Sequence, residues 1–250
     1  MMASALRGAV SFLTRLPAGG DAADWEAFRR VPATFPAVGY LVGALAGLAV
    51  VLPIPAATAV ATYLVALYLL TGLTHADGLA DLGDAAAVHG DAERRRAVLK
   101  DSATGVGGAL ALGVTLLVLA FGALGAAGIG SGLAAFRIVV AAEVGAKVGM
   151  ALLVCLGDPG HEGLGSRLVG ESAPADLVLV AALALPAIVA VGGTLPALAA
   201  ALLAGPLVAL LVKRWADRRL GGITGDVLGA ANELGRATAL HAGVVVWTLF

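Results

Sequence analysis

Long apolar stretches alternate along the chain with short polar connections. Seven stretches can cross a bilayer, since a transmembrane helix needs about 20 mostly apolar residues. They cover residues 34–52, 56–74, 103–127, 131–156, 174–192, 194–212 and 226–249. Unpaired backbone groups are too costly in lipid, so such stretches form helices rather than strands. The pattern predicts an all-α polytopic membrane protein with about seven transmembrane helices in one bundle, forming a single domain over residues 1–250.

The charged connections all fall on one side of this predicted bundle. Basic residues lie before residue 34 and in the loops 75–102, 157–173 and 213–225, whereas the other three connections carry no charge. Basic loops mark the cytoplasmic side of a membrane. We therefore expect a multi-pass protein of the cell membrane with a cytoplasmic N-terminus and an outer C-terminus.

Composition supports the membrane class and narrows the choice of partners. The chain is 60% hydrophobic and 13% charged, about half the charge of a typical soluble domain, and its mean hydropathy is +0.95. A net charge of −1 leaves no excess of basic residues for phosphate neutralisation, which argues against a nucleic-acid partner. Lipid is the expected environment, and the sequence is compatible with a homo-oligomer as well as with a monomer.

An acidic motif follows the second predicted span. Asp77, Asp81 and Asp84 lie at positions i, i+4 and i+7, which places them within about 60° of arc on one helix face. Three carboxylates stacked in this way repel one another unless a cation lies among them, and hard oxygen ligands favour Mg²⁺. The alternative is a solvated acidic surface. His75 projects from the other side of such a helix, where packing explains it better than metal ligation.

A second acidic motif opens the last span. A glycine-rich turn leads to Asp226 at the membrane mouth, and Glu233 follows seven residues later, about 10 Å further along the same face. A carboxylate at membrane depth is costly and is a functional candidate by default. Alternatively, Asp226 caps the helix and Glu233 pairs with Arg236.

Two further groups of polar residues enter the predicted bundle. Backbone amides of a glycine-rich turn at a helix start can hold phosphate, and the candidates here are Lys100, Asp101, Ser102, Gly105, Gly107 and Gly108. Asp101 or Ser102 as an ordinary N-cap is the alternative. In the fourth span, Glu143 and Lys147 are four residues apart, which suits either mutual neutralisation or substrate contact.

Together these motifs predict a Mg²⁺-dependent membrane transferase acting on a phosphorylated substrate from the cytoplasmic side. Carboxylate-held Mg²⁺ beside a basic, glycine-rich loop suits the transfer of a phosphoryl-linked group. Two alternatives stay open. One is a transferase of the CDP-alcohol phosphotransferase or prenyltransferase kind, although the former expects Arg where this chain has Asp81. The other is a transporter, which should also carry polar groups in its outer connections.

Five stretches resemble the signature sequences of the cobalamin synthase family, the adenosylcobinamide-GDP ribazoletransferases. They are residues 11–17, 35–39, 75–81, 100–108 and 221–233, in the family's order and over nearly the whole chain. Ala76 and Ala85 depart from the leucine and glycine common there.

The resemblance implies the joining step of vitamin B12 assembly. The cobinamide phosphate moiety of adenosylcobinamide-GDP is transferred to α-ribazole or its 5′-phosphate, GMP leaves, and adenosylcobalamin or its phosphate forms with Mg²⁺ as the cofactor. Carried onto this chain, the resemblance assigns Asp77, Asp81 and Asp84 to the metal. It gives Asp226 and Glu233, together with Asp81, to catalysis.

Overall fold

The computed structural model confirms the all-α class. It describes residues 1–101, 103–160, 163–189 and 194–250. The α-helices are α1 (Met2–Leu13), α2 (Ala22–Arg29), α3 (Thr34–Gly47), α4 (Ala56–Thr71), α5 (Thr74–Ala87), α6 (Ala92–Val98), α7 (Val106–Ala127), α8 (Gly132–Leu156), α9 (Leu164–Leu168), α10 (Leu177–Ala184), α11 (Leu195–Arg219) and α12 (Gly225–Leu249). Short 3₁₀ helices are η1 (Leu48–Val51), η2 (Pro174–Asp176) and η3 (Leu185–Ile188). No strand occurs in these ranges.

Four of the described helices are long and apolar enough to cross a membrane. They are α3 with η1, α7, α8 and α11, and the bent pair of α4 and α5 gives a fifth if it is one broken span. Helix α12 is as long as α8 but carries several polar residues, and residues 174–188 form only a shorter apolar helix. Seven spans therefore stay a prediction, whereas a helical membrane protein is what the structure describes.

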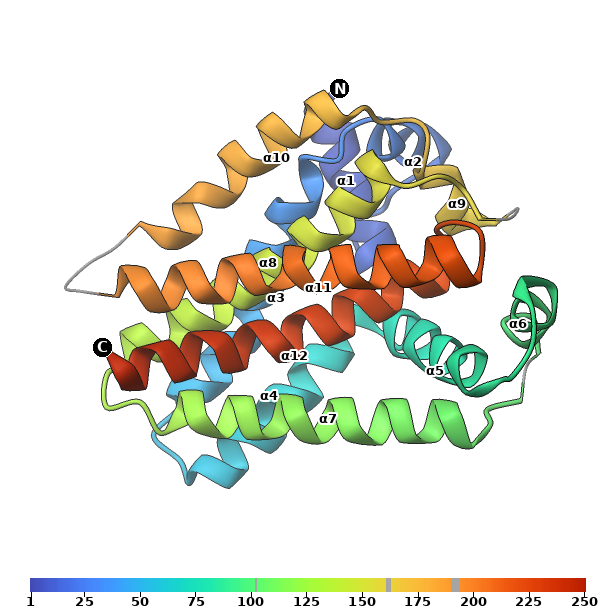
Figure 1. Cartoon of the computed structure of the whole chain (residues 1–250). Coiled ribbons are helices and arrows are strands. Elements are labelled where there is room, and N and C mark those ends of the chain that lie inside the picture. The colour runs from blue at the N-terminus through green and yellow to red at the C-terminus, as the bar shows by residue number, and fades with distance from the viewer. Residues whose placement is uncertain (102, 161–162, 190–193) are drawn as a thin grey trace.

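Helix α8 occupies the centre of the bundle, with 83% of its most apolar window buried against other helices. It packs against α3, α11 and α12. Small residues permit these crossings: a Cβ added at Gly205 of α11 would lie 2.3 Å from backbone atoms of Gly145 in α8. Such close approach favours helix association in lipid. Helix α7 lies at the outside, and Figure 1 shows it running alongside α12.

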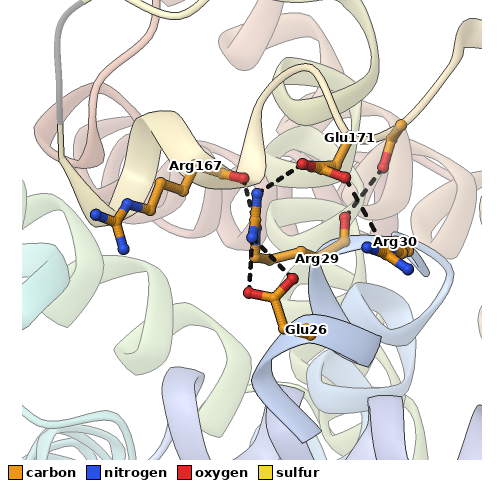
Figure 2. A network of polar contacts seen from close by, with 6 residues as sticks. Glu26, Arg29, Arg30, Arg167 and Glu171 are labelled. Atoms are coloured by element: carbon orange, nitrogen blue, oxygen red, sulfur yellow. Dashed lines mark hydrogen bonds and ion pairs between the residues drawn. The ribbon is translucent and has the colours of Figure 1, made fainter. Parts of the chain in front are cut away.

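Contacts at one end of the bundle join the four charged stretches. The N-terminal stretch meets the 157–173 loop through Arg29, which donates to Glu171 (2.7 Å) and to the carbonyl of Arg167 (2.8 Å), as Figure 2 shows. The 157–173 loop meets the 213–225 loop where the Ile223 amide donates to the Asp158 carbonyl (2.8 Å).

The remaining charged loop, 75–102, reaches the same end through Arg96, whose side chain donates to the Leu220 carbonyl (2.9 Å). The C-terminus lies at the far end of the molecule, beside the connection between α7 and α8 (Figure 1). The one-sided charge expected from the sequence therefore corresponds to one physical end of the structure.

The N-terminal helices α1 and α2 are clamped together by an acidic side chain. Asp24 of α2 is buried, and it accepts hydrogen bonds from Arg7 (2.6 and 3.1 Å) and from the Ser4 hydroxyl. The Arg7 guanidinium, followed by the Ser4 hydroxyl, lowers the pKa of Asp24 to about 2. A carboxylate with these partners stays ionised down to strongly acidic pH.

Helices α4 and α5 meet at a sharp bend of 95°. Gly72 lies at the bend with φ +69, a conformation that glycine adopts without a steric cost. Two residues later α5 begins, and its first turn lies against the middle of the bundle, where His75 is buried. The bend therefore starts the aspartate-bearing helix inside the protein and directs its end toward the charged loops.

Candidate active site

The two acidic motifs come together where α5 crosses the start of α12. A Cβ added at Gly78 would lie 2.7 Å from the Cα of Asp226. One turn deeper, a Cβ at Gly229 would lie 2.9 Å from the carbonyl oxygen of His75. Real Cβ atoms do not approach backbone this closely, so both positions require glycine. The two glycines bring the aspartate face of α5 within reach of Asp226.

The three carboxylates of α5 differ in how far they are exposed. Asp77 is exposed, whereas Asp81 and Asp84 are half-buried. Asp81 experiences electrostatic repulsion from Asp77, Asp226 and Asp84, in that order. Within the described ranges, no three His, Cys, Asp or Glu side chains are placed to enclose a metal ion by themselves. Mg²⁺ commonly takes only one or two carboxylates and completes its shell with water and substrate phosphates, which suits Asp81 with a neighbouring aspartate.

Asp84 has a second function that its spacing did not reveal. Its carboxylate accepts hydrogen bonds from the backbone amides of Gly105 (2.7 Å) and Gly108 (2.9 Å) at the start of α7. Gly105 is the N-cap of α7 and has no side chain to supply a cap, so Asp84 satisfies these orphan donors from another helix. Asp84 and the predicted phosphate-binding turn are therefore bound to each other, and their roles toward metal and phosphate stay predictions.

The rest of the predicted phosphate-binding stretch lies in front of α7. Lys100 is exposed, and Asp101 accepts a hydrogen bond from the Ala103 amide (3.1 Å) within a tight turn. Because the N-cap is Gly105, the alternative that Asp101 or Ser102 caps this helix is wrong. Ser102 itself lies outside the described residues, and Gly107 packs against the carbonyl of Gly83 in α5.

Asp226 lies in the first turn of α12 and is not its cap. The N-cap is Thr224, whose hydroxyl accepts from the Val227 amide (3.3 Å) and donates to the Asp226 carboxylate (3.2 Å). The capping alternative for Asp226 is therefore wrong. A half-buried carboxylate beside the aspartates of α5 suits a role toward metal or substrate, and the positive end of the α12 dipole favours its charge.

Glu233 lies deeper and belongs to a buried group of charged and amide side chains, which we call the interior polar cluster. This cluster consists of Glu143, Lys147, Asn232, Glu233 and Arg236, all at most 1% exposed. Glu233 accepts from the Tyr68 hydroxyl (2.9 Å) and from the Asn232 amide (3.0 Å), and it lies 3.3 Å from the Arg236 guanidinium. The pairing of Glu233 with Arg236 is thus present, and a catalytic role for Glu233 stays a prediction.

Glu143 and Lys147 of α8 do not form the mutual pair that one of the two sequence alternatives expected. Glu143 forms its ion pair with Arg236 of α12 at 3.1 Å, and Lys147 donates to the Asn232 side chain. No ion pair joins Glu143 to Lys147 among the described residues. Charges buried in lipid-spanning helices are expensive unless paired, and here the pairing crosses between helices.

Asn232 connects the interior polar cluster to the aspartate helix. Its amide nitrogen lies 3.3 Å from Nδ1 of the buried His75, in the first turn of α5. Sequence reasoning overlooked Asn232 and Tyr68, because neither forms a charge pattern. The position of Asn232 next to Glu233 was the only feature of the sequence that pointed to it. The packing role expected for His75 agrees with its burial.

Comparisons with known proteins agree on one family. A family model described as cobalamin-5-phosphate synthase matches residues 5–244. Proteins named adenosylcobinamide-GDP ribazoletransferase from Halorubrum lacusprofundi and Haloquadratum walsbyi are 56% and 50% identical to this chain, with 100% of both chains covered in each comparison. The protein of the same name from Halobacterium salinarum is 47% identical over 78% of this chain and 98% of its own. No solved structure matches.

Proposed function

The chain belongs to the cobalamin-5-phosphate synthase family, and we propose that its transfer chemistry takes place where α5 crosses the start of α12. The enzyme is an adenosylcobinamide-GDP ribazoletransferase of vitamin B12 biosynthesis. The backbone contact between Gly78 and Asp226 is the main support for this location, because it brings the two acidic motifs together.

The reaction replaces one phosphorus–oxygen bond by another. A ribose hydroxyl oxygen of α-ribazole, or of its 5′-phosphate, attacks the phosphorus bonded to cobinamide. The bond from that phosphorus to the GMP oxygen breaks, GMP leaves with the electron pair, and the hydroxyl proton is released. Catalysis of such a transfer rests on positioning and on electrostatic stabilisation of the phosphate oxygens.

The residues of the crossing suit Mg²⁺, with Asp81 and Asp77 as the first ligands and Asp226 beside them. Their oxygen atoms are the donors that Mg²⁺ prefers, and the repulsion on Asp81 is relieved by a cation. When bound, the metal would neutralise the pyrophosphate and stabilise the leaving phosphate. Asp226, oriented by the Thr224 hydroxyl, would align the attacking hydroxyl or accept its proton.

Lys100 would hold the nucleotide phosphates, and the turn at Gly105–Gly108 would join it where a phosphate oxygen replaces the Asp84 carboxylate. Lys100 is exposed in the connection between α6 and α7. The amides of Gly105 and Gly108 already bind the carboxylate of Asp84, which indicates that this turn accepts an anion. Substrate phosphate would therefore contact Lys100 first. Basic loops at the charged end of the bundle favour a cytoplasmic site in the cell membrane, where nucleotide-linked substrates are available.

A reconstituted assay tests the site. Protein in liposomes receives adenosylcobinamide-GDP, α-ribazole phosphate and Mg²⁺, and the release of GMP and the formation of cobalamin phosphate are followed. We expect Asp81→Asn to lower turnover by at least a hundredfold. Glu93→Gln, on the exposed side of α6, is the matched control and should keep wild-type turnover. Full activity of Asp81→Asn would show that the site lies elsewhere, whatever the family.

A further inference from the structure

An apolar groove lies on the side of α5 that faces away from the aspartates. Its volume is about 450 Å³, within the range of ligand pockets, about 300–1,000 Å³. Helix α5 contributes Leu79 and Leu82, α7 contributes Val114, and α11 contributes Leu211 and Trp215. The side chains of Val114 and Leu211 are 56% and 69% exposed, so the groove opens toward the surroundings of the bundle rather than into its interior.

A basic pocket of about 220 Å³ continues from this groove at the charged end of the bundle. The two share Leu211 and Trp215, and the basic pocket adds Arg214, Arg218 and Arg219. All three arginines are exposed and none bonds to another residue in the described part of the chain. The nearby Asp217 is paired with Lys213 at 2.7 Å, so it does not neutralise them.

The groove is separate from the proposed transfer site. Each residue advances a helix by about 100°, so Leu79 projects from α5 roughly opposite to Asp77 and Asp81, and Leu82 points about 100° away from Asp81. Asp84, bonded to the start of α7, closes the contact between α5 and α7 on the aspartate side. A phosphate at Asp81 therefore does not occupy the groove.

We propose that the groove and the basic pocket together bind one anionic lipid of the surrounding membrane. An apolar chain fills the groove between α5, α7 and α11, and the headgroup phosphate binds Arg214, Arg218 and Arg219. Two features argue for this occupant. The apolar wall passes into a cationic pocket at the level where headgroups lie, and arginines at a cytoplasmic helix end attract anionic lipid. Trp215, at the junction, is suited to the interface between chain and headgroup.

Quenching of Trp215 fluorescence by brominated lipids tests the site. Trp25 and Trp247 are first replaced by Phe, so that Trp215 is the only tryptophan left. The protein is placed in phosphatidylcholine vesicles that contain equal small fractions of chain-brominated phosphatidylglycerol or chain-brominated phosphatidylcholine. We expect phosphatidylglycerol to quench Trp215 at a much lower fraction than phosphatidylcholine. Equal quenching by the two lipids would overturn the proposal, because it would indicate ordinary surrounding lipid.

Substitutions then identify the headgroup ligands. The triple variant R214Q/R218Q/R219Q should abolish the preference, with affinity for phosphatidylglycerol falling about fivefold for each arginine removed. The control variant R30Q/R94Q/R167Q loses the same charge from exposed positions elsewhere at this end and should keep the preference. Retention of the preference in the first variant, or an equal loss in both, would contradict the assignment to this pocket.

Discussion

The geometry gives Asp84 a capping role that the metal prediction did not include, and the two roles separate experimentally. Its carboxylate accepts from two backbone amides of α7, at 2.7 and 2.9 Å. Hydrogen bonds to a charged group contribute about 1.5–3 kcal/mol each, and loss of a helix cap costs about 0.5–2 kcal/mol. Because Asp84 is half-buried and water can partly replace it, we expect Asp84→Ala to lower the unfolding free energy by about 2–3 kcal/mol. Asp84→Asn, which keeps one acceptor, should lose about half of that.

Asp81→Asn supplies the comparison. Asp81 is surrounded by like charges, so its neutralisation should leave stability unchanged or raise it while turnover collapses. Unfolding by SDS in mixed micelles gives the free energies, and the Mg²⁺ concentration at half-maximal turnover gives the metal requirement. An Asp84→Ala variant as stable as wild type would show that Asp84 does not cap α7. If Asp84→Asn raises the Mg²⁺ concentration at half-maximal turnover as strongly as Asp81→Asn does, Asp84 also binds the metal.

Three further predictions concern the helix crossing, the interior and the N-terminal clamp. Gly78→Ala places a Cβ 2.7 Å from the neighbouring backbone and should reduce turnover at least tenfold, whereas Gly113→Ala, with nothing within 4 Å, should leave turnover unchanged. Arg236→Gln removes the cation from two buried carboxylates and should destabilise by about 3–5 kcal/mol in SDS unfolding, with Glu143→Gln/Arg236→Gln costing less than the sum of the single changes. Since the folded pKa of Asp24 is about 2, below its ordinary value, its contribution should be complete above pH about 4 and disappear as pH falls toward 2. Acid unfolding curves of Asp24→Asn should therefore be flatter than those of wild type in that range.

The hydropathy pattern predicted most of the long helices, because their apolar length is a local property. Residues 226–249 were predicted as a span, and α12 covers Gly225–Leu249. Residues 174–192 were predicted as one span, but the described part of this range forms the short helix α10 flanked by two 3₁₀ helices, with Pro186 at the start of the second. The helical period also placed Asp77 and Asp81 correctly on one face. Asp84 lies on the same face and also accepts hydrogen bonds from α7. This contact joins distant segments, so the spacing along one helix does not predict it.

The partners within the interior polar cluster also depend on contacts between helices that are distant in the sequence. The i, i+4 rule favoured Glu143 with Lys147, but the partner on another helix has the better geometry, and a sequence pattern does not specify which helix faces which. Asn232 carries no charge and matches no periodic pattern, so only the structure reveals its contact with His75. The family resemblance gave no information on these contacts. The match to the family model and to the named relatives decides against the alternative transferases and the transporter.

The ion pair between Glu143 and Arg236 constrains how the protein is made. Helix α8 is synthesised well before α12, and its Lys147 donates to Asn232, 85 residues later in the chain. Until then, a charged helix must wait in the translocation machinery or in a transient pairing, because lipid receives such side chains poorly. Arg236 and Glu233 likewise make α12 a poor candidate for insertion alone. The interior polar cluster therefore closes only when α12 packs against α8, so the pairing of these charges is a late step of assembly.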